Sequence, residues 1–490
     1  MKRYLGVIFC LLVLCTVKAQ EINLTLEKAI EQANDSSLEA YRSYNMYLSG
    51  YWEYRTYKAN RLPSLTLKMT PAQYYRDITK RYDSEQNIDI YRNQQSFSAY
   101  GNLAVTQNFD LTGGTFYLDT ELGYMRNFGE NTYSQFNTVP VRIGYSQSLV
   151  GYNPFKWERR IEPLKYEKQK KDLIYNMEQV SENVVSYFFE LAMAQAEYKL
   201  AQNNLVSSDI LYRIGMQRYG IASISQADLL TLKLDAVNAR NTLRNNEVAL
   251  RRAMFSLASY LNFDTSVPIH LTLPEKPLDR TISVEDALEI AKMNNPRLLE
   301  QKQNILEAER NVDKTRKESR FNISLNASIG FNQVADNIGD VYHKPQQQDL
   351  VSLSISVPIV DWGVRKGKYN MAKNNLNVVK VSARQQEISV EEEIIMTVNE
   401  FNNQLSLIGS AEEALKLSAM AYDETVKRFM IGKSDINSLT LSLNRQQTAQ
   451  RNYISSLNDY WQKYYKIRRL TLYDFVSGLS LVNRFDFDYK

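Results

Sequence analysis

The sequence has few of the residues from which catalytic and metal-binding sites are built. It contains only two cysteines and two histidines in 490 residues. Cys10 and Cys15 both fall in the first twenty residues, and no metal-ligand spacing surrounds His270 or His343. The Gly113-Gly114 pair lies between two strand-like segments rather than in a phosphate-binding loop. We therefore expect a protein without enzyme activity, metal or cofactor.

Long apolar runs and blocks of like charge are also lacking. After residue 20 no stretch approaches the roughly 18 apolar residues of a membrane-spanning helix. A secreted chain without such a helix can span a membrane only as a closed barrel of strands. The 59 basic and 55 acidic residues are interspersed, which argues against a nucleic-acid partner.

Residues 1–19 have the pattern of a secretory signal. Lys2 and Arg3 form its basic start, residues 5–17 form its apolar core, and cleavage is expected after residue 19. A membrane anchor is one alternative, but the apolar run is short for a membrane span. Lipidation at Cys15 is another. Cleavage would remove both cysteines, so the mature chain would have no disulfide.

The most regular pattern in the chain is an alternation of apolar and small polar residues over 351–359. A period of two predicts a strand with one apolar and one polar face. We expect the apolar face to contact lipid, and its members are Val351, Leu353, Ile355 and Val357. Alternating segments, each about as long as the ten residues of a tilted membrane strand, lie near 65–69, 97–105, 116–124, 139–149 and 323–331. Polar stretches lie between them, notably 76–95 and 126–138.

Helical segments flank these strands in the same order twice. The opening LTLEKAIEQA of residues 24–33 returns as ISVEDALEIA at residues 282–291. Each copy continues through a helix, strands, a long helix, a break and a second long helix. The breaks fall at 219–223 and 429–434. Because the repeat is far longer than the 20–50 residues of a solenoid unit, we interpret the chain as a tandem duplication.

The expected organisation follows from these patterns. It consists of a signal segment at 1–19, a first repeat at 20–280, a second repeat at 281–470 and a tail at 471–490. The first repeat has a helix, strands over 63–150, long helices over 156–262 and a linker. The second repeat has a helix, strands over 321–360 and long helices over 364–470.

Helices of this length cannot bury themselves against a small globular core, so we expect antiparallel coiled coils. The strands are too few to close a barrel alone, since a barrel needs about eight. Closed symmetry between copies would supply the rest. The predicted fold is mainly α with membrane β, with strands at one end of a helical cylinder.

Three features together resemble the TolC family of outer-membrane efflux proteins. They are the duplicated halves, the Asn295-Pro296 pair after the repeated opening, and the SVPIVDWGVR turn at 356–365. The resemblance implies a homotrimer with a shared outer-membrane β-barrel and a long periplasmic α-barrel of coiled-coil helices, in a Gram-negative cell. It also implies docking to a periplasmic adaptor (membrane fusion) protein and an inner-membrane pump. The first half has more strand-like sequence than the one hairpin usual in this family.

The resemblance also implies a gate at the periplasmic tip, formed by the two breaks. Asp228 stands where the family has its gating carboxylate, and the family's tyrosine and arginine positions hold Phe429 and Ser434. Lys433 is adjacent and could replace the arginine, and Asp435 lies near the family's acidic ring. The other expected tip residues are Arg218, Tyr219 and Arg428. An acid that only stabilises the start of a helix is the alternative for Asp228.

The leading functional hypothesis is an outer-membrane duct of a tripartite efflux or type I secretion system, conducting substrates passively. A periplasmic coiled-coil adaptor is the second hypothesis, although adaptors insert one hairpin between soluble β domains. A structural coiled-coil surface protein is the third, but it would not need strands of membrane length.

Overall fold

The computed structural model describes residues 22–85, 87–128, 132–265, 267–274 and 281–484. The predicted signal segment, with both cysteines, lies outside the described residues, as do parts of the linker and of the tail. The chain divides into two compact units. Unit 1 comprises residues up to 48, 168–298 and 387 onwards, and unit 2 comprises 49–167 and 299–386.

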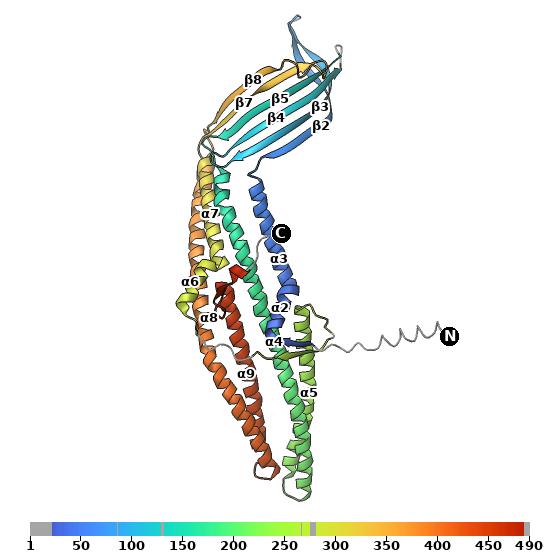
Figure 1. The fold of residues 1–490 in the computed structure, drawn as a ribbon, viewed down its shortest axis with the longest axis vertical. Helices are drawn as coiled ribbons and strands as arrows, with labels where there is room; N and C mark the ends of the chain where they lie inside the picture. Colours follow the sequence, from blue (N-terminus) through green and yellow to red (C-terminus); the bar gives the residue numbers. More distant parts are fainter. Residues whose placement is uncertain (1–21, 86, 129–131, 266, 275–280, 485–490) are drawn as a thin grey trace, which may run out of the picture. The chain divides into compact units, whose positions relative to one another are not determined.

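The helices and strands follow the order expected for a duplication (Figure 1). The first half contains β1 (Ile22–Thr25), α2 (Leu26–Ser36), α3 (Leu38–Ala59), β2 (Ser64–Asp83), β3 (Ile88–Phe109), β4 (Gly114–Phe128), β5 (Tyr133–Ser148), α4 (Pro154–Gly220), α5 (Gln226–Tyr260) and β6 (Ile269–Thr272). The second contains α6 (Val284–Asn294), α7 (Pro296–Glu318), β7 (Asn322–Ala335), β8 (Gln346–Ser356), α8 (Val364–Met430), α9 (Ile436–Thr471), β9 (Tyr473–Asp474), β10 (Leu479–Ser480) and a 3-10 turn, η1 (Leu481–Arg484). The predicted mainly α fold with an antiparallel sheet is confirmed.

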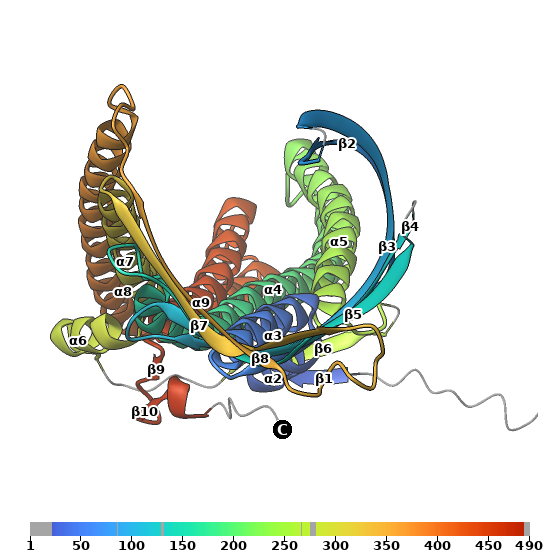
Figure 2. The same ribbon diagram turned by 90° about the horizontal axis from the view of Figure 1, so that it is seen from above.

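Unit 2 contains a six-stranded antiparallel sheet in the order β2-β3-β4-β5-β7-β8. The sheet is visibly curved when seen from above (Figure 2). Its first four strands come from the first repeat and two from the second, so the additional hairpin of the first repeat belongs to this same sheet. The chain leaves β8 through Asp361, whose carboxylate accepts bonds from the backbone N–H groups of Gly363 and Arg365 at the start of α8.

The polar stretch 76–95, which lies between two of the alternating segments, is a paired hairpin in the sheet. Arg76 is opposite Gln95, and the pairing continues to Asp83 opposite Ile88. Apolar alternation alone did not indicate this pairing. Strands that extend beyond an apolar band satisfy their backbone hydrogen bonds with each other and need no apolar face.

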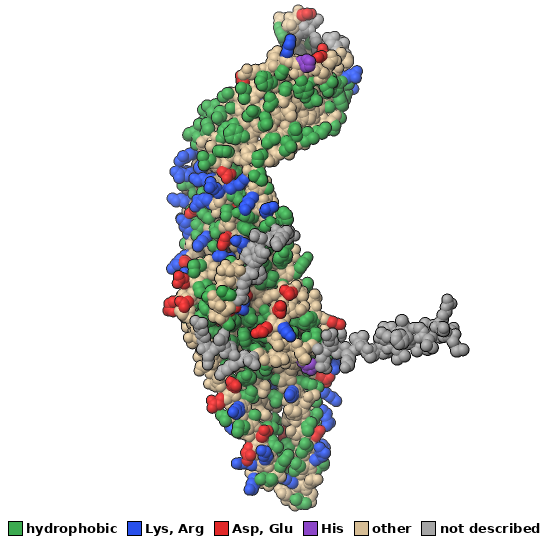
Figure 3. All heavy atoms as spheres, viewed as in Figure 1, with side chains coloured by type: hydrophobic (Ala, Val, Ile, Leu, Met, Phe, Trp, Pro, Cys, Tyr) green, Lys and Arg blue, Asp and Glu red, His purple; other side chains and the backbone are tan. Residues whose placement is uncertain are grey.

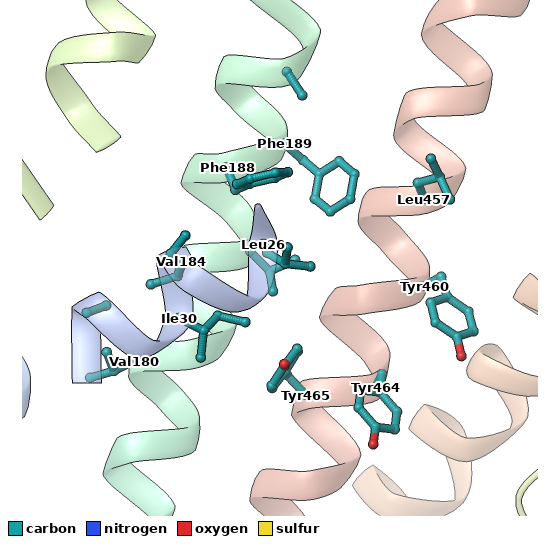
Figure 4. Packing of buried hydrophobic residues seen from close by; sticks show 14 of the residues in the cluster. Leu26, Ile30, Val180, Val184, Phe188, Phe189, Leu457, Tyr460, Tyr464 and Tyr465 are labelled. Carbon is teal, nitrogen blue, oxygen red and sulfur yellow. The ribbon is translucent and has the colours of Figure 1, made fainter. Parts of the chain in front are cut away.

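Unit 1 has a hydrophobic core where the repeated openings pack on the long helices. Leu26 and Ile30 from α2 meet Val184 and Phe188 from α4, and Leu457 comes from α9 (Figure 4). The two openings are capped in the same way. The hydroxyls of Thr25 and Ser283 accept the backbone N–H groups of Lys28 and Asp286.

The single helix expected before the strands of the first repeat is divided at Ser37. The backbone N–H of Ser37 donates to the carbonyl oxygen of Ala33, and its hydroxyl accepts from the backbone N–H of Ala40 over 3.1 Å. Ser37 thus ends α2 and begins α3, because serine can cap both ends where the backbone is extended. Asn295 ends α6 in the second repeat by the equivalent bond to Ala291.

Candidate functional site at the two helix turns

The first turn, residues 221–225, joins α4 to α5 within unit 1. Ala222 has a left-handed backbone with a φ of 61°. The backbone N–H of Ser223 donates to the carbonyl oxygen of Arg218 over 2.8 Å, and that of Ala222 donates to Tyr219 over 2.9 Å. These two bonds form a Schellman motif, which satisfies the last free carbonyls of α4.

The second turn, residues 431–435, joins α8 to α9 with the same geometry. Gly432 has a φ of 76° and replaces Ala222 at the left-handed position. The backbone N–H of Lys433 donates to Arg428 over 2.9 Å, and that of Gly432 donates to Phe429 over 3.0 Å. The two turns are therefore structural repeats, and Arg218 and Arg428 occupy equivalent positions in them.

The helices that follow the turns begin with the same pair of residue types in opposite order. Ser225 caps α5, and the carboxylate of Asp228 accepts the backbone N–H of Ser225 over 3.1 Å in a capping box. Asp435 caps α9 and accepts the backbone N–H of Ser438 over 2.7 Å. This bond and the hydroxyl of Ser438 hold the pKa of Asp435 below its usual value. Both acids thus stabilise a helix start.

The two equivalent arginines make different contacts, and this difference links the turns. The guanidinium of Arg218 donates to the carbonyl oxygens of Phe429 and Met430, over 2.9 and 3.1 Å. It also lies 5.2 Å from the centre of the Phe429 ring. Arg428 instead donates to Glu424 on its own helix over 3.2 Å. The position equivalent to Glu424 in the first repeat is Ile214, so Arg218 has no such acid one turn away.

Several expected tip residues therefore meet in the structure. Arg218 contacts Phe429, whose ring is buried, whereas Tyr219, Lys433 and Asp435 are exposed. The bonds of the Asp228 carboxylate in the described residues go to Ser225 and do not include Lys433. Sequence reasoning missed that Arg218 binds main-chain carbonyls, because a backbone acceptor leaves no residue signature. The functional role of these residues stays a prediction.

A second candidate surface is the apolar face of the sheet in unit 2. The cross-strand register places Ile355 opposite Ile323 and Leu353 opposite Leu325. Further members of this face on the other strands include Leu65, Leu67, Val105, Leu118 and Ile143. Ile355 is 61% exposed and Leu67 62% exposed. Hydrophobic side chains accordingly gather over the sheet in Figure 3. The four residues predicted to face lipid, at 351, 353, 355 and 357, are all exposed.

The opposite face of the sheet holds a buried polar group that the sequence did not reveal. Asp119 is buried and accepts two bonds from Arg142, over 3.0 and 2.6 Å, and one from the side chain of Asn102 over 2.9 Å. A bidentate pair of this kind fixes the position of the arginine. One face of the sheet is therefore apolar and exposed, and the other contains a charged network.

Comparison with protein families bears on what this arrangement is for. Residues 287–471 match the family model described as outer membrane efflux protein. This segment is an outer membrane efflux protein domain. The domain includes β7, β8 and the second helix turn. The predicted resemblance to outer-membrane efflux proteins and the predicted outer-membrane location are confirmed at the level of the family.

Solved structures extend the likeness beyond the efflux protein domain to most of the chain. The outer membrane channel CmeC of Campylobacter jejuni is 13% identical, with a TM-score of 0.66 over 91% of this chain and 85% of CmeC. The outer-membrane channel OprN is 14% identical, with a TM-score of 0.65 over 91% of this chain and 89% of OprN. VceC of Vibrio cholerae is 13% identical, with a TM-score of 0.63 over 91% of this chain and 95% of VceC. At this identity the likeness shows a shared fold.

No curated protein sequence matches the chain. None of the helices in the described part of the chain combines the length and the apolar character needed to cross a membrane. The family description and the three structural neighbours concern efflux proteins, channels and an outer membrane protein, and none of them is described as an enzyme.

Proposed function

We propose that the chain is one subunit of a homotrimeric export duct in the Gram-negative outer membrane. The duct reaches into the periplasm and conducts substrates passively. A periplasmic adaptor and an inner-membrane pump deliver the substrates and supply the energy. The observation that carries the proposal is the six-stranded sheet, which has one apolar exposed face and two open edges.

The two unpaired edges of the sheet favour a barrel that is closed by strands from several copies of the chain. β2 and β8 are the end strands of the sheet, and each pairs with a single neighbour. Unpaired edges of long strands are unfavourable in lipid, where backbone groups have no water to bind. Three copies of a six-stranded sheet would supply eighteen strands to one barrel. The apolar face would contact lipid, and the Asp119–Arg142 pair would face the lumen.

The long helices carry a matching surface for neighbouring subunits. On α8, Val364, Met371 and Val378 recur every seven residues, and their exposures are 56%, 59% and 62%. An exposed heptad stripe on a soluble helix costs free energy unless another helix covers it. In the proposed trimer, a helix of the adjacent subunit covers this stripe.

The two helix turns supply the gate in this proposal. Arg218 ties the first turn to the second within one subunit through two carbonyl oxygens. Three copies of this link would stabilise one arrangement of the tip, and contact with the adaptor would change it. Asp228 and Asp435, which are held at helix starts, bring carboxylates to the same two turns.

Planar-bilayer recording of the purified full-length protein tests the proposal. We expect a trimeric mass in detergent and low conductance in the closed state, with discrete openings. A stable monomer that inserts into membranes would contradict the shared barrel. A trimer that never conducts, even when Arg218 and Asp228 are both replaced by alanine, would contradict the duct.

A further inference from the structure

Unit 1 contains a cavity that has no role in the proposed duct. It has a volume of about 460 Å³ and lies between α6, α8, α9 and the segment that follows α9. This volume is within the range of small-molecule sites, about 300–1,000 Å³. Its lining includes Phe401, Tyr460, Tyr464, Tyr473 and Phe475.

The floor of the cavity is an aromatic cluster built from two helices. Phe401 of α8 has its ring centre 4.9 Å from that of Tyr460 and 6.2 Å from that of Tyr464, both on α9. All three side chains are at least 96% buried. Figure 4 shows the rings of Tyr460 and Tyr464 on the side of α9 turned away from Leu26. Only the parts of these rings that line the cavity can contact a ligand, and the guanidinium of Arg468 already lies 5.8 Å from the centre of the Tyr464 ring.

One polar side chain in this floor forms no hydrogen bond within the described part of the chain. The hydroxyl of Tyr464 donates to Asp474 over 2.5 Å, whereas the hydroxyl of Tyr460 makes no hydrogen bond there although the side chain is only 2% exposed. Burial raises the pKa of Tyr460, so this hydroxyl remains protonated at neutral pH. Because Tyr460 lines the cavity, its hydroxyl can bind a ligand atom or a water there.

Two carboxylates at the rim of the cavity have no cationic partner within the described part of the chain. Asp286 and Glu289 lie one turn apart on α6 and both line the cavity. Neither side chain has an ion-pair or hydrogen-bond partner among the described residues, and the cavity lining contains no lysine, arginine or histidine. The same face of α6 continues with Ile290 and Met293, so apolar surface separates the acids from the aromatic floor.

We propose that this cavity binds a small organic cation, an ammonium group carried on an aromatic or short alkyl body. The cationic group lies at the rim, where the carboxylates of Asp286 and Glu289 neutralise its charge. The apolar body packs on Phe401 and Phe475, while the hydroxyl of Tyr460 binds a polar atom of the ligand or a water it retains. An anion would be repelled by the two rim carboxylates. The inference does not depend on conduction, since the whole lining lies in unit 1.

Equilibrium binding to the full-length protein in a nonionic detergent tests this inference. The probe is benzyltrimethylammonium, with benzyl alcohol as the neutral ring and benzoate as the anionic ring. We expect saturable binding of the cation, roughly tenfold tighter than benzyl alcohol because the rim carboxylates attract its charge. Equal affinity for the neutral ring, or no saturable binding of the cation, would overturn the proposal.

Variants locate the site. The double variant Asp286→Asn with Glu289→Gln keeps the shape of the rim and removes its charge, so we expect about tenfold weaker binding of the cation. The matched control is Glu285→Gln on the same helix, whose carboxylate accepts the hydroxyl of Ser283 and does not line the cavity. An unchanged oligomeric mass shows that each variant is folded. Equal affinities of the double variant and the control would refute the site, whether or not the protein conducts.

Discussion

The guanidinium of Arg218 donates to the carbonyl oxygen of Phe429 over 2.9 Å, although the two residues are 211 positions apart in the chain. The bond joins equivalent turns of two tandem repeats, but it is not reciprocated. Arg428 binds Glu424 instead. The two repeats differ at a position one turn before these arginines, where the first has Ile214 and the second has Glu424. The contact of Arg218 can be broken without altering the hydrogen bonds within either turn.

Replacing Arg218 is expected to open the proposed gate. Arg218→Ala removes hydrogen bonds to two carbonyls, and bonds to a charged group contribute roughly 1.5–3 kcal/mol. Across three subunits this is enough to shift a closed population substantially, since about 5.5 kcal/mol carries an equilibrium from 1:99 to 99:1. Conductance in a planar bilayer should rise severalfold. Arg428→Ala, the equivalent change in the other repeat, should leave conductance near that of the original protein, and equal effects of the two variants would disprove the assignment.

Asp228 requires an experiment that separates its local bond from gating. Asp228→Ala should raise conductance severalfold if the carboxylate also holds the closed state. Ser225→Ala is the matched change, because it removes the same capping box, at a cost of about 1 kcal/mol, but keeps the carboxylate. Bilayer conductance of both variants decides the question. The same conductance in both would restrict Asp228 to capping α5.

The proposed membrane face predicts an unequal response along β8. Ile355→Arg should lower the free energy of unfolding by about 2–4 kcal/mol if the residue lies near the bilayer midplane. Ser354→Arg, on the other face of the strand, should be tolerated. Urea-induced unfolding in lipid vesicles measures both changes. Similar losses would show that the faces are assigned wrongly.

The heptad stripe on α8 predicts how subunits assemble. Val378→Glu places a charge in the proposed helix–helix contact and should reduce the trimer fraction in native mass measurement. Lys373→Glu introduces the same side chain on the far side of α8 and should leave the trimer intact. If Val378→Glu remains fully trimeric, the stripe is not a subunit interface.

The segment after α9 should loosen only in strong acid. Burial of Asp474 opposes its ionisation, but bonds from the hydroxyl of Tyr464 and from backbone N–H groups, with the charge of Arg468, lower its pKa from 3.8 to about 2. A carboxyl whose pKa is lowered on folding stabilises the protein above its unfolded value, and that contribution is lost as pH falls towards the folded value. Asp474→Asn should therefore be less stable than the original protein at pH 6. The difference in thermal midpoint should shrink between pH 4 and pH 2, and a constant difference would contradict this account.

Features encoded within a few neighbouring residues were determined by the sequence alone. Alternation over 351–359 predicted a strand, the repeated openings predicted a duplication, and the Gly432 and Ala222 regions predicted breaks between long helices. These depend on periodicity and local hydrogen bonding, which act over one or two turns.

Tertiary structure alone decided which distant groups meet. The acceptor of Arg218 is a main-chain carbonyl 211 positions away, and every residue has such a carbonyl, so no side chain marks it. The pairing of the polar stretch 76–95 depended on the neighbouring strand satisfying its backbone, whatever its apolar content. Tyr460 looked like any other core aromatic until the packing of α6 and α9 placed it in the lining of the same cavity as two carboxylates. Tertiary packing brings these groups together. A sequence pattern reports on neighbours within a few turns of helix and does not show which distant residues will pack against each other.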